Sequence, residues 1–365
     1  FISENKKMSI IDKKVVIFMS FGHCGIDWLH SLLDSHPEIL ILPQVSFYRV
    51  WKIINGDSIR NPDDLFLALH DHLENHPYRK HHELLDNDKN NKLFYEKLES
   101  NLNQFGCNRK SVFFSIHEAY AHANSINLEN IKVIVEQEHV CFPSKAVIDD
   151  FGSSNLLFIL RDPRAAIAGF YRGVQRKCGS DLRCYRYRSA EHLSGWRYAV
   201  RLWKENNVKI VKNELLVQDL KREMTDISDW MGLKYNSILT VSTSSNGTAW
   251  KTDSCYISRD DPEVEKNIFF SPENVKKRWM GVLSKKEITI IESIFSDVFS
   301  EFDYDRIVEK KILNSISGYL YFIFPNKIWR NYFRNNSFLK ALHLYFSDVY
   351  THIFVLYGDG SKKYD

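Results

Sequence analysis

Short, continuous apolar runs alternate with longer helical patterns through most of this 365-residue chain. A parallel sheet whose two faces are both covered by helices gives this alternation, because its strands are buried on each side. The predicted strands are residues 15–20, 38–42, 111–116, 132–135, 156–160 and 209–211. The predicted helices lie near residues 25–34, 62–76, 92–104, 143–151, 163–174, 189–206 and 215–231. We therefore expect an α/β fold with a doubly wound parallel sheet flanked by helices.

The first predicted strand leads into a glycine-punctuated turn and then into a helix. The stretch reads VVIFMSFGHCGIDWLHSLLDSHPEI over residues 15–39, and its turn is Phe21-Gly22-His23-Cys24-Gly25. Glycines let backbone N–H groups converge, and a helix N-terminus adds partial positive charge, so the turn suits an anion. It lacks the Gly-Lys-Ser/Thr ending of nucleoside-triphosphate loops. The same pattern is also typical of a plain turn before a helix.

A second stretch, LLFILRDPRAAIAGFYRG over residues 156–173, places an arginine at the carboxyl end of a buried strand. Pro163 suits the first turn of the helix that follows. Ligands of open α/β sheets gather at the carboxyl ends of the strands, where Arg161 and Arg164 suit a phosphate or a sulfate. The alternative is a structural pair between Arg161 and Asp162.

Together these two stretches resemble the signatures of the sulfotransferase family. That family has a strand–loop–helix frame of the form T-Y-P-K-S-G-T-T-W, followed by L-L-x-x-H-P. The frame here reads SFGHCGIDW over residues 20–28 and LLDSHP over residues 32–37. The family's second signature is R-D-P-R at a strand end, which is Arg161-Asp162-Pro163-Arg164 here, with Gly169 at the family's serine position.

Three further stretches follow in the family's order. They are NELLVQDLKREMTDISDWMGLKY (213–235), NGTAWKTDS (246–254) and ENVKKRWMGVLSKKEITIIESIFSDVFSEFDYD (273–305). They resemble the family's Y-E-D-L segment, its N-G-x-x-W segment and its closing helices with W-x-x-x-L. The resemblance covers roughly residues 14–305 and implies a P-loop-like sulfotransferase fold.

The resemblance also implies an activity and a donor site. The activity is transfer of a sulfuryl group from 3′-phosphoadenosine 5′-phosphosulfate to a hydroxyl of a glycan or a similar acceptor, with no metal ion. The implied donor-binding residues are Gly22, His23, Cys24, Gly25, Ile26, Asp27, Trp28, Arg161, Gly169 and Trp250. The loop would hold the 5′-phosphosulfate and Arg161 the 3′-phosphate. Trp28 matches the adenine-stacking aromatic and Trp250 would line the same cleft, although either tryptophan also suits a core position.

Transfer to a hydroxyl needs a base that accepts the hydroxyl proton. In cytosolic family members a catalytic histidine ends the equivalent strand, and His139 stands at the matching distance before Arg161. We therefore expect His139 to be the general base. Glu138 is the second candidate, since other branches of the family use a carboxylate, and His117 after the apolar run SVFFSI is the third.

Several positions depart from the family's pattern. His23 replaces the loop's lysine or arginine, so the cation beside the leaving phosphate depends on a protonated imidazole whose charge fades above about pH 6.5 unless a phosphate raises its pKa. Ile26 and Asp27 replace two threonines, which removes two hydroxyls and adds a carboxylate. Gly169 replaces a serine, and Gln137 replaces a lysine near the base.

These departures leave three interpretations open. The chain is an active enzyme in which other cations, such as Arg164, Arg172 or Lys145, compensate for the altered loop. Alternatively, it uses a different sulfated or phosphorylated donor. In the third interpretation it is a catalytically altered protein that binds a nucleotide or a partner without sulfuryl transfer.

Residues 1–14 are expected to form an N-terminal extension, residues 15–306 the α/β domain and residues 307–365 an aromatic-rich helical C-terminal extension. The basic insertion RGVQRKCGSDLRCYRYR at residues 172–188 suits an anionic or sugar-containing acceptor, including a lipid-linked one, or is simply a solvated surface. Pro325 and charges interrupt the tail, so we expect it to pack on the domain, form a homodimer or lie on a membrane surface rather than span a bilayer.

The composition limits the remaining function classes. A net charge of +3 gives no global reason to expect nucleic-acid binding. The 6 cysteines form no zinc-like cluster; Cys178 and Cys184 either bridge a small loop in an oxidising compartment or are cytosolic thiols. The start FISENKKMSIIDKK lacks the apolar run of a signal peptide. We expect a cytoplasmic protein, with membrane association or a trimmed targeting segment as alternatives.

Overall fold

The structure of the chain is a computed structural model. It describes residues 9–20, 22–43, 46–75, 88–138, 144–169, 201–205, 208–244, 248–249, 272–277, 279–308, 330 and 333–357. The sequence-based predictions that concern Phe21, His139, Trp250 and the basic insertion at 172–188 lie outside these residues.

The strands are β1 (Lys14–Met19), β2 (Ile39–Ile41), β3 (Val133–Glu138), β4 (Leu156–Leu160), β5 (Lys209–Lys212), β6 (Thr243–Ser244) and β7 (Thr248–Ala249). The α-helices are α1 (Ile26–Leu33), α2 (Phe47–Ile53), α3 (Pro62–Asn75), α4 (Asp88–Phe105), α5 (Arg109–Ala123), α6 (Ser144–Phe151), α9 (Asn213–Gln218), α10 (Leu220–Met231), α11 (Pro272–Lys277), α12 (Lys285–Ile294), α13 (Ser296–Glu301) and α16 (Phe338–Tyr357). Single 3-10 turns are η1 (Ile10–Asp12), η2 (Gly56–Ser58), η3 (Ser153–Asn155) and η4 (Ser237–Thr240).

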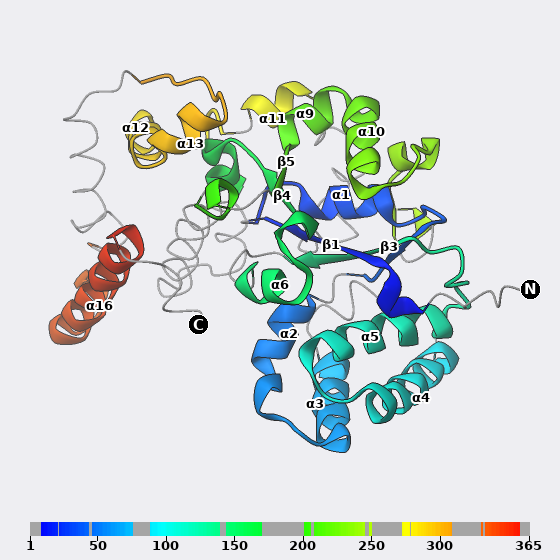
Figure 1. Cartoon of the computed structure of the whole chain (residues 1–365). Helices are drawn as coiled ribbons and strands as arrows, with labels where there is room; N and C mark the ends of the chain where they lie inside the picture. Colours follow the sequence, from blue (N-terminus) through cyan, green and yellow to red (C-terminus); the bar gives the residue numbers. More distant parts are fainter. Residues whose placement is uncertain are drawn as a thin grey trace, which may run out of the picture.

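The main sheet has 5 parallel strands in the order β2-β3-β1-β4-β5, which confirms the doubly wound α/β prediction (Figure 1). After β1 the chain moves to one side of that strand and builds β2 and β3; it then crosses over and builds β4 and β5 on the other side. The order of the strands therefore reverses at β1. In open α/β sheets, ligands bind at the carboxyl ends of the strands beside such a reversal.

The register shows which residues meet at this edge of the sheet. Met19 at the end of β1 lies opposite Glu138 in β3 and opposite Phe158 in β4. Arg161 leaves the sheet directly after β4 ends at Leu160. The loop after β1, the end of β3 and Arg161 are consequently neighbours, as parallel pairing requires.

The sheet is buried on both faces. In β1, Val16, Ile17, Phe18 and Met19 are fully inaccessible to solvent. Helix α1 and helix α2 cover opposite faces of β3, because the side chain of Gln137 reaches α1 whereas those of its two strand neighbours reach α2. Burial on both sides explains why these strands read as continuous apolar runs.

The predicted strand at residues 111–116 is wrong, because these residues belong to helix α5. The helix is buried nearly all round, so its apolar residues show no amphipathic period, and an apolar run of this kind does not distinguish a buried helix from a buried strand. The start of α5 is set by Asn108, whose side chain accepts a hydrogen bond from the N–H of Ser111.

Two other elements differ from the predictions. The helix expected over 215–231 is two helices, α9 and α10, which are divided at Asp219; that side chain caps α10 by accepting from the N–H of Arg222. Helix α2 was not predicted. It is short, its N-cap residue Ser46 makes no side-chain capping bond, and its first N–H groups are instead capped by two carboxyl groups of β3.

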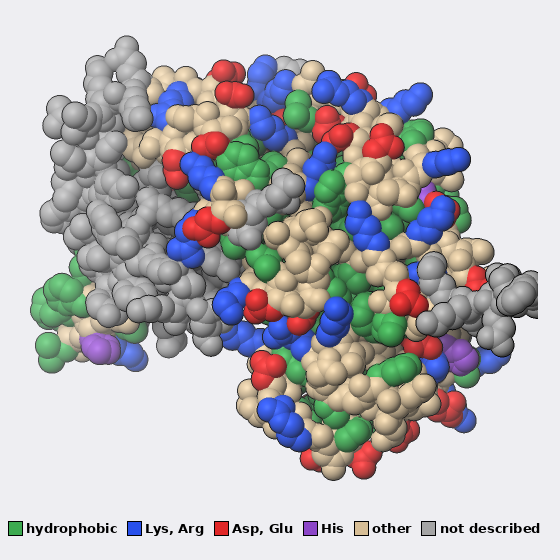
Figure 2. Space-filling model, in the orientation of Figure 1, with side chains coloured by type: hydrophobic (Ala, Val, Ile, Leu, Met, Phe, Trp, Pro, Cys, Tyr) green, Lys and Arg blue, Asp and Glu red, His purple; other side chains and the backbone are tan. Residues whose placement is uncertain are grey.

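Helix α16 confirms a helix within the predicted C-terminal extension, and it exposes apolar side chains. Phe338, Leu339 and Phe346 are 64%, 76% and 59% exposed, and hydrophobic atoms gather around α16 in Figure 2. Elsewhere on the face shown, basic and acidic side chains are intermixed. None of the helices that the structure describes is both long enough and apolar enough to cross a bilayer. The division at residue 306, membrane contact and dimerisation remain predictions.

Candidate functional site

The loop after β1 turns with a run of left-handed backbone conformations. Gly22, His23 and Gly25 have φ angles of 80°, 54° and 89°, a range in which side chains other than glycine are strained. Within the loop, the thiol of Cys24 donates to the carbonyl of Gly22 at 3.3 Å. Helix α1 then begins at Ile26, with Gly25 as its N-cap residue. The loop and the helix N-terminus are therefore continuous, with the geometry that the sequence predicts, and anion binding by them stays a prediction.

Gly25 is required for a second reason besides its backbone conformation. A Cβ atom at this position would lie 2.0 Å from Nδ2 of Asn213, which is the first residue of α9. No side chain fits between them. The loop is thus held against α9, the element that follows β5.

Gly169 lies beside the loop from another direction. A Cβ atom at Gly169 would stand 3.3 Å from Cβ of His23, so a serine in this place would crowd the side chain of His23 at its Cβ atom. Residues 163–169 are helical, and they carry this glycine back from the turn after β4 to the loop after β1. Two departures from the family's pattern, at His23 and at Gly169, are therefore in contact with each other.

Arg161 connects the turn after β4 to this loop. Its Nη1 donates to the carbonyl of His23 at 3.1 Å, and its Nη2 to the carbonyl of Val275 in α11 at 3.5 Å. The residue is only 4% exposed, and its Nε has no hydrogen-bond partner among the described residues. The alternative reading, a structural pair between Arg161 and Asp162, does not hold, since Asp162 forms its ion pair with Arg164 instead. A buried guanidinium held by neutral carbonyls retains its attraction for an anion.

The carboxylate of Asp27 has a hydrogen-bond partner in β3. Its Oδ1 accepts a hydrogen bond of 2.6 Å from Nε2 of Gln137 in β3. These are the two positions at which the family carries a threonine and a lysine, so a second pair of departures is also in contact. The amide occupies one lone-pair direction of the carboxylate and orients it toward β3.

For the nucleotide donor that the resemblance implies, replacing Gln137 with alanine is expected to weaken the binding of adenosine 3′,5′-bisphosphate by about tenfold, because the Asp27 carboxylate loses the charge-assisted hydrogen bond that orients it toward β3. Adding Asp27→Asn should restore the affinity, since the repelling charge is then gone. Calorimetric titration of both variants measures this, with Gln104→Ala on the exposed surface of α4 as the matched control. Failure of Asp27→Asn to restore binding contradicts an electrostatic role.

Glu138, the second base candidate, is the last residue of β3 and is fully buried. Its Oε1 accepts from the N–H of Tyr48 at 2.7 Å, and Glu136 accepts from the N–H of Phe47 at 2.9 Å, so two carboxylates cap the N-terminus of α2. Oε2 of Glu138 has no hydrogen-bond partner among the described residues. Burial and, after it, the charge of Glu136 raise the pKa of Glu138 well above its usual value.

The raised pKa of Glu138 makes folding stability depend on pH. A carboxyl whose pKa is higher in the folded state than the usual 4.5 contributes stability that is complete below pH 4.5 and is lost as pH rises through the folded pKa. Glu138→Gln keeps an acceptor for the N–H of Tyr48 but cannot ionise. We expect the stability of the variant relative to the parent to increase as pH is raised above 4.5. Urea denaturation across this pH range measures the difference in stability between variant and parent. A difference that does not change with pH contradicts the prediction. Glu96→Gln is the control, because Glu96 is an exposed residue of α4.

The remaining candidate residues that the structure describes are all buried. His117 lies inside α5, fully buried, where Nδ1 contacts the carbonyl of Phe113 at 2.8 Å and Nε2 lies 3.4 Å from Oε2 of Glu136. It therefore does not end a strand, which removes the reason for proposing it as a base. Trp28 is 7% exposed and belongs to the hydrophobic core, and its adenine-stacking role remains a prediction. Ile26 and Cys24 are also buried.

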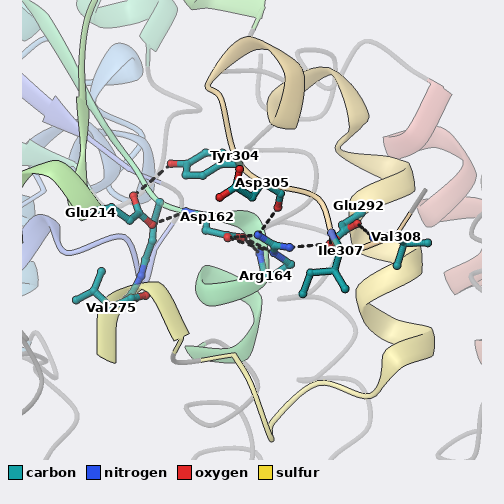
Figure 3. A network of polar contacts seen from close by, with 10 residues as sticks. Asp162, Arg164, Glu214, Val275, Glu292, Tyr304, Asp305, Ile307 and Val308 are labelled. Carbon is teal, nitrogen blue, oxygen red and sulfur yellow. Dashed lines mark hydrogen bonds and ion pairs between the residues drawn. The ribbon is translucent and has the colours of Figure 1, made fainter. Parts of the chain in front are cut away.

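Arg164 is not available as a compensating cation for the loop. Its guanidinium forms ion pairs with Asp162 at 2.6 Å and with Glu292 of α12 at 2.7 Å, and it donates to the carbonyl of Asp305 at 2.8 Å (Figure 3). It also stacks over Trp279, 4.4 Å from the ring centroid. Lys145, the second candidate, is exposed and pairs with Asp149 one turn away in α6. The third, Arg172, lies outside the described residues.

Sequence reasoning missed four residues that shape this site: Asn213, Glu214, Glu292 and Tyr304. All of them belong to the segments 213–235 and 273–305, which were noted as similar to the family but were given no role. Their side chains meet the loop and the Arg161 turn only through the tertiary fold. Among the described residues, no group of three or more histidine, cysteine or acidic side chains is arranged to hold a metal ion.

No family model matches the chain, and no curated protein sequence matches it. Among solved structures, the chain is similar to a sulfotransferase domain from the curacin biosynthetic pathway, with a TM-score of 0.50 and 12% identity over 80% of this chain and 99% of that one. A sulfotransferase domain from the olefin synthase of Synechococcus PCC 7002 also matches, with a TM-score of 0.49 and 14% identity over 80% of this chain and 96% of that one. At such identity the likeness concerns the fold alone.

Proposed function

We propose that this chain, which has the fold of a sulfotransferase domain, transfers a sulfuryl group from 3′-phosphoadenosine 5′-phosphosulfate to a hydroxyl of a sugar-containing acceptor. The observation that carries the proposal is the buried guanidinium of Arg161 beside the glycine loop. It is 4% exposed, bonded only to backbone carbonyls among the described residues, and its Nε is unpaired there. A buried cation of this kind is favourable when an anion neutralises it.

The residues present fit the two ends of this donor. The backbone N–H groups of the loop and the N-terminus of α1 suit the 5′-phosphosulfate, because they supply positive potential without a metal ion. Arg161 suits the 3′-phosphate, since an arginine fork binds phosphate oxygens with two parallel hydrogen bonds. His23 belongs to the loop and its carbonyl accepts from Arg161; a protonated imidazole here would take part of the charge that develops on the leaving phosphate.

The chemical step needs a base at the carboxyl end of β3. The acceptor oxygen forms a bond to sulfur as the bond between sulfur and the phosphate oxygen breaks. The base takes the acceptor's proton, and adenosine 3′,5′-bisphosphate leaves. We assign the base to His139, which follows β3, with Glu138 as the alternative because it ends this strand opposite Met19 and its Oε2 is not hydrogen bonded among the described residues.

The proposed acceptor class rests on the positive charge of one segment of the sequence. The basic insertion at residues 172–188 follows the helix that begins at Pro163, and it would attract an anionic sugar or lipid-linked sugar to the edge of the sheet. The alternative function is nucleotide binding without transfer. The observation that favours it is Asp27, a carboxylate in the first turn of α1, where the family has a hydroxyl.

The deciding experiment measures transfer and binding on the same protein. The wild type is incubated with 3′-phosphoadenosine 5′-phosphosulfate and anionic or neutral oligosaccharides, and release of adenosine 3′,5′-bisphosphate is followed; its binding is measured by calorimetry. We expect release that depends on the acceptor and stops in His139→Ala while nucleotide binding persists. Binding without release by any acceptor favours the alternative function. Absence of nucleotide binding by the folded wild type overturns both the proposed sulfuryl transfer and the alternative, nucleotide binding without transfer.

A further inference from the structure

The chain that follows α13 crosses back over the turn that carries Arg161. We call residues 302–308 the closing segment. The carbonyl of Asp305 accepts from Nη2 of Arg164 at 2.8 Å. Glu292 binds the next two peptides, since its Oε1 accepts from the N–H of Ile307 at 3.1 Å and its Oε2 from the N–H of Val308 at 2.9 Å. Figure 3 shows Arg164 beneath Asp305 and Glu292 of α12 beside Ile307 and Val308.

Tyr304 connects the same segment to Glu214 on the other side of the turn (Figure 3). Its hydroxyl donates to Oε2 of Glu214 at 3.4 Å, while Oε1 of Glu214 accepts from the N–H of Asp162 at 2.8 Å. That N–H belongs to the peptide bond joining Arg161 to Asp162. Glu214 therefore orients the peptide directly after Arg161, and Tyr304 contacts the other oxygen of the same carboxyl group through a long hydrogen bond.

This arrangement is shielded from water. Glu214 is 8% exposed, and burial raises the pKa of both Glu214 and Tyr304, so the phenol keeps its proton at neutral pH and remains a donor. The ammonium of Lys212 lies 5.3 Å from the centroid of the Tyr304 ring and donates to the carbonyl of Phe302. With little water to compete, these contacts hold a defined geometry.

We propose that Tyr304 and Glu214 are a positioning pair that directs Arg161 toward the 3′-phosphate of the donor. The closing segment thereby determines how strongly the site prefers a nucleotide with a 3′-phosphate over one without it. The inference rests on the proposed function, because it takes the ligand of Arg161 to be that phosphate. Neither residue touches the donor; both act through the peptide after Arg161.

The test compares two nucleotides rather than one. Calorimetry gives the affinities of wild type, Tyr304→Phe and Glu214→Gln for adenosine 3′,5′-bisphosphate and for adenosine 5′-phosphate. We expect the preference for the bisphosphate to fall by about fivefold or more in both variants, the scale of one buried hydrogen bond. Tyr95→Phe is the matched control, since its hydroxyl donates to Glu74 at 2.9 Å on helices α3 and α4. It should keep the wild-type preference.

The outcomes separate positioning from stability. If the variants melt at lower temperature and bind both nucleotides equally less well, or keep the wild-type preference, the pair is merely structural and the inference is overturned. If the wild type binds neither nucleotide, the proposed function fails and takes this inference with it. Glu214→Gln removes the oxygen that accepts from Tyr304 but keeps one that accepts from the N–H of Asp162, so it breaks the pair on its own and decides the matter if Tyr304→Phe does not fold.

Discussion

Replacing Arg161 with alanine is expected to weaken the binding of adenosine 3′,5′-bisphosphate by at least about 100-fold, the cost of removing one partner of a buried charged pair. The effect is large because Arg161 is only 4% exposed and no carboxylate of the described residues forms an ion pair with it. Binding of adenosine 5′-phosphate should change much less, since that nucleotide lacks the group that Arg161 would hold.

Two further variants make this result interpretable. Arg161→Lys keeps the charge but loses the fork geometry, so we expect an affinity between those of the wild type and Arg161→Ala. Arg109→Ala removes another partly buried guanidinium, whose Nε pairs with Asp150 at 2.7 Å, and should not alter nucleotide binding. Wild-type affinity in a folded Arg161→Ala protein would falsify the assignment of the 3′-phosphate to this residue.

Replacing Arg164 with methionine is expected to lower the free energy of unfolding by about 3–5 kcal/mol. The side chain is 5% exposed, and the carboxylates it pairs with, Asp162 and Glu292, are 8% and 2% exposed. Removing the arginine leaves both charges buried without their cation, and it also removes the hydrogen bond to the carbonyl of Asp305. The loss should appear in urea denaturation followed by tryptophan fluorescence, to which Trp279 beside the guanidinium contributes.

A second substitution tests the cause of this loss. In the Arg164→Met protein, Glu292→Gln removes one of the stranded charges and keeps an acceptor for the closing segment, so part of the stability should return. Lys145→Met breaks an exposed ion pair with Asp149 and should cost no more than about 1 kcal/mol. Equal losses at Arg164 and Lys145 would show that the buried network contributes no more than a surface pair.

The prediction of the sheet succeeded because its signal is local. Strands buried on both faces read as continuous apolar runs, and β1, β3 and β4 were recognised in this way. Helix α5 was misread as a strand because a helix buried all round leaves the same apolar run. Helix α2 was missed because its N-terminus is capped by Glu136 and Glu138, which are distant in sequence.

In the candidate site, too, some features follow from local sequence motifs and others from tertiary contacts alone. The sequence by itself determined the glycine loop and the strand end at Arg161, because both are contiguous motifs whose backbone requirements are written in neighbouring residues. Only the tertiary structure shows that His23 lies against Gly169 and that Asp27 is hydrogen bonded to Gln137. The four positions that depart from the family's pattern are therefore two pairs of neighbouring residues. The tertiary structure also decided that Arg164 binds the closing segment, whereas Nε of Arg161 has no hydrogen-bond partner among the described residues. The physical reason is that parallel pairing of β3, β1 and β4 brings together side chains far apart along the chain, and their contacts depend on register and burial, which no local pattern encodes.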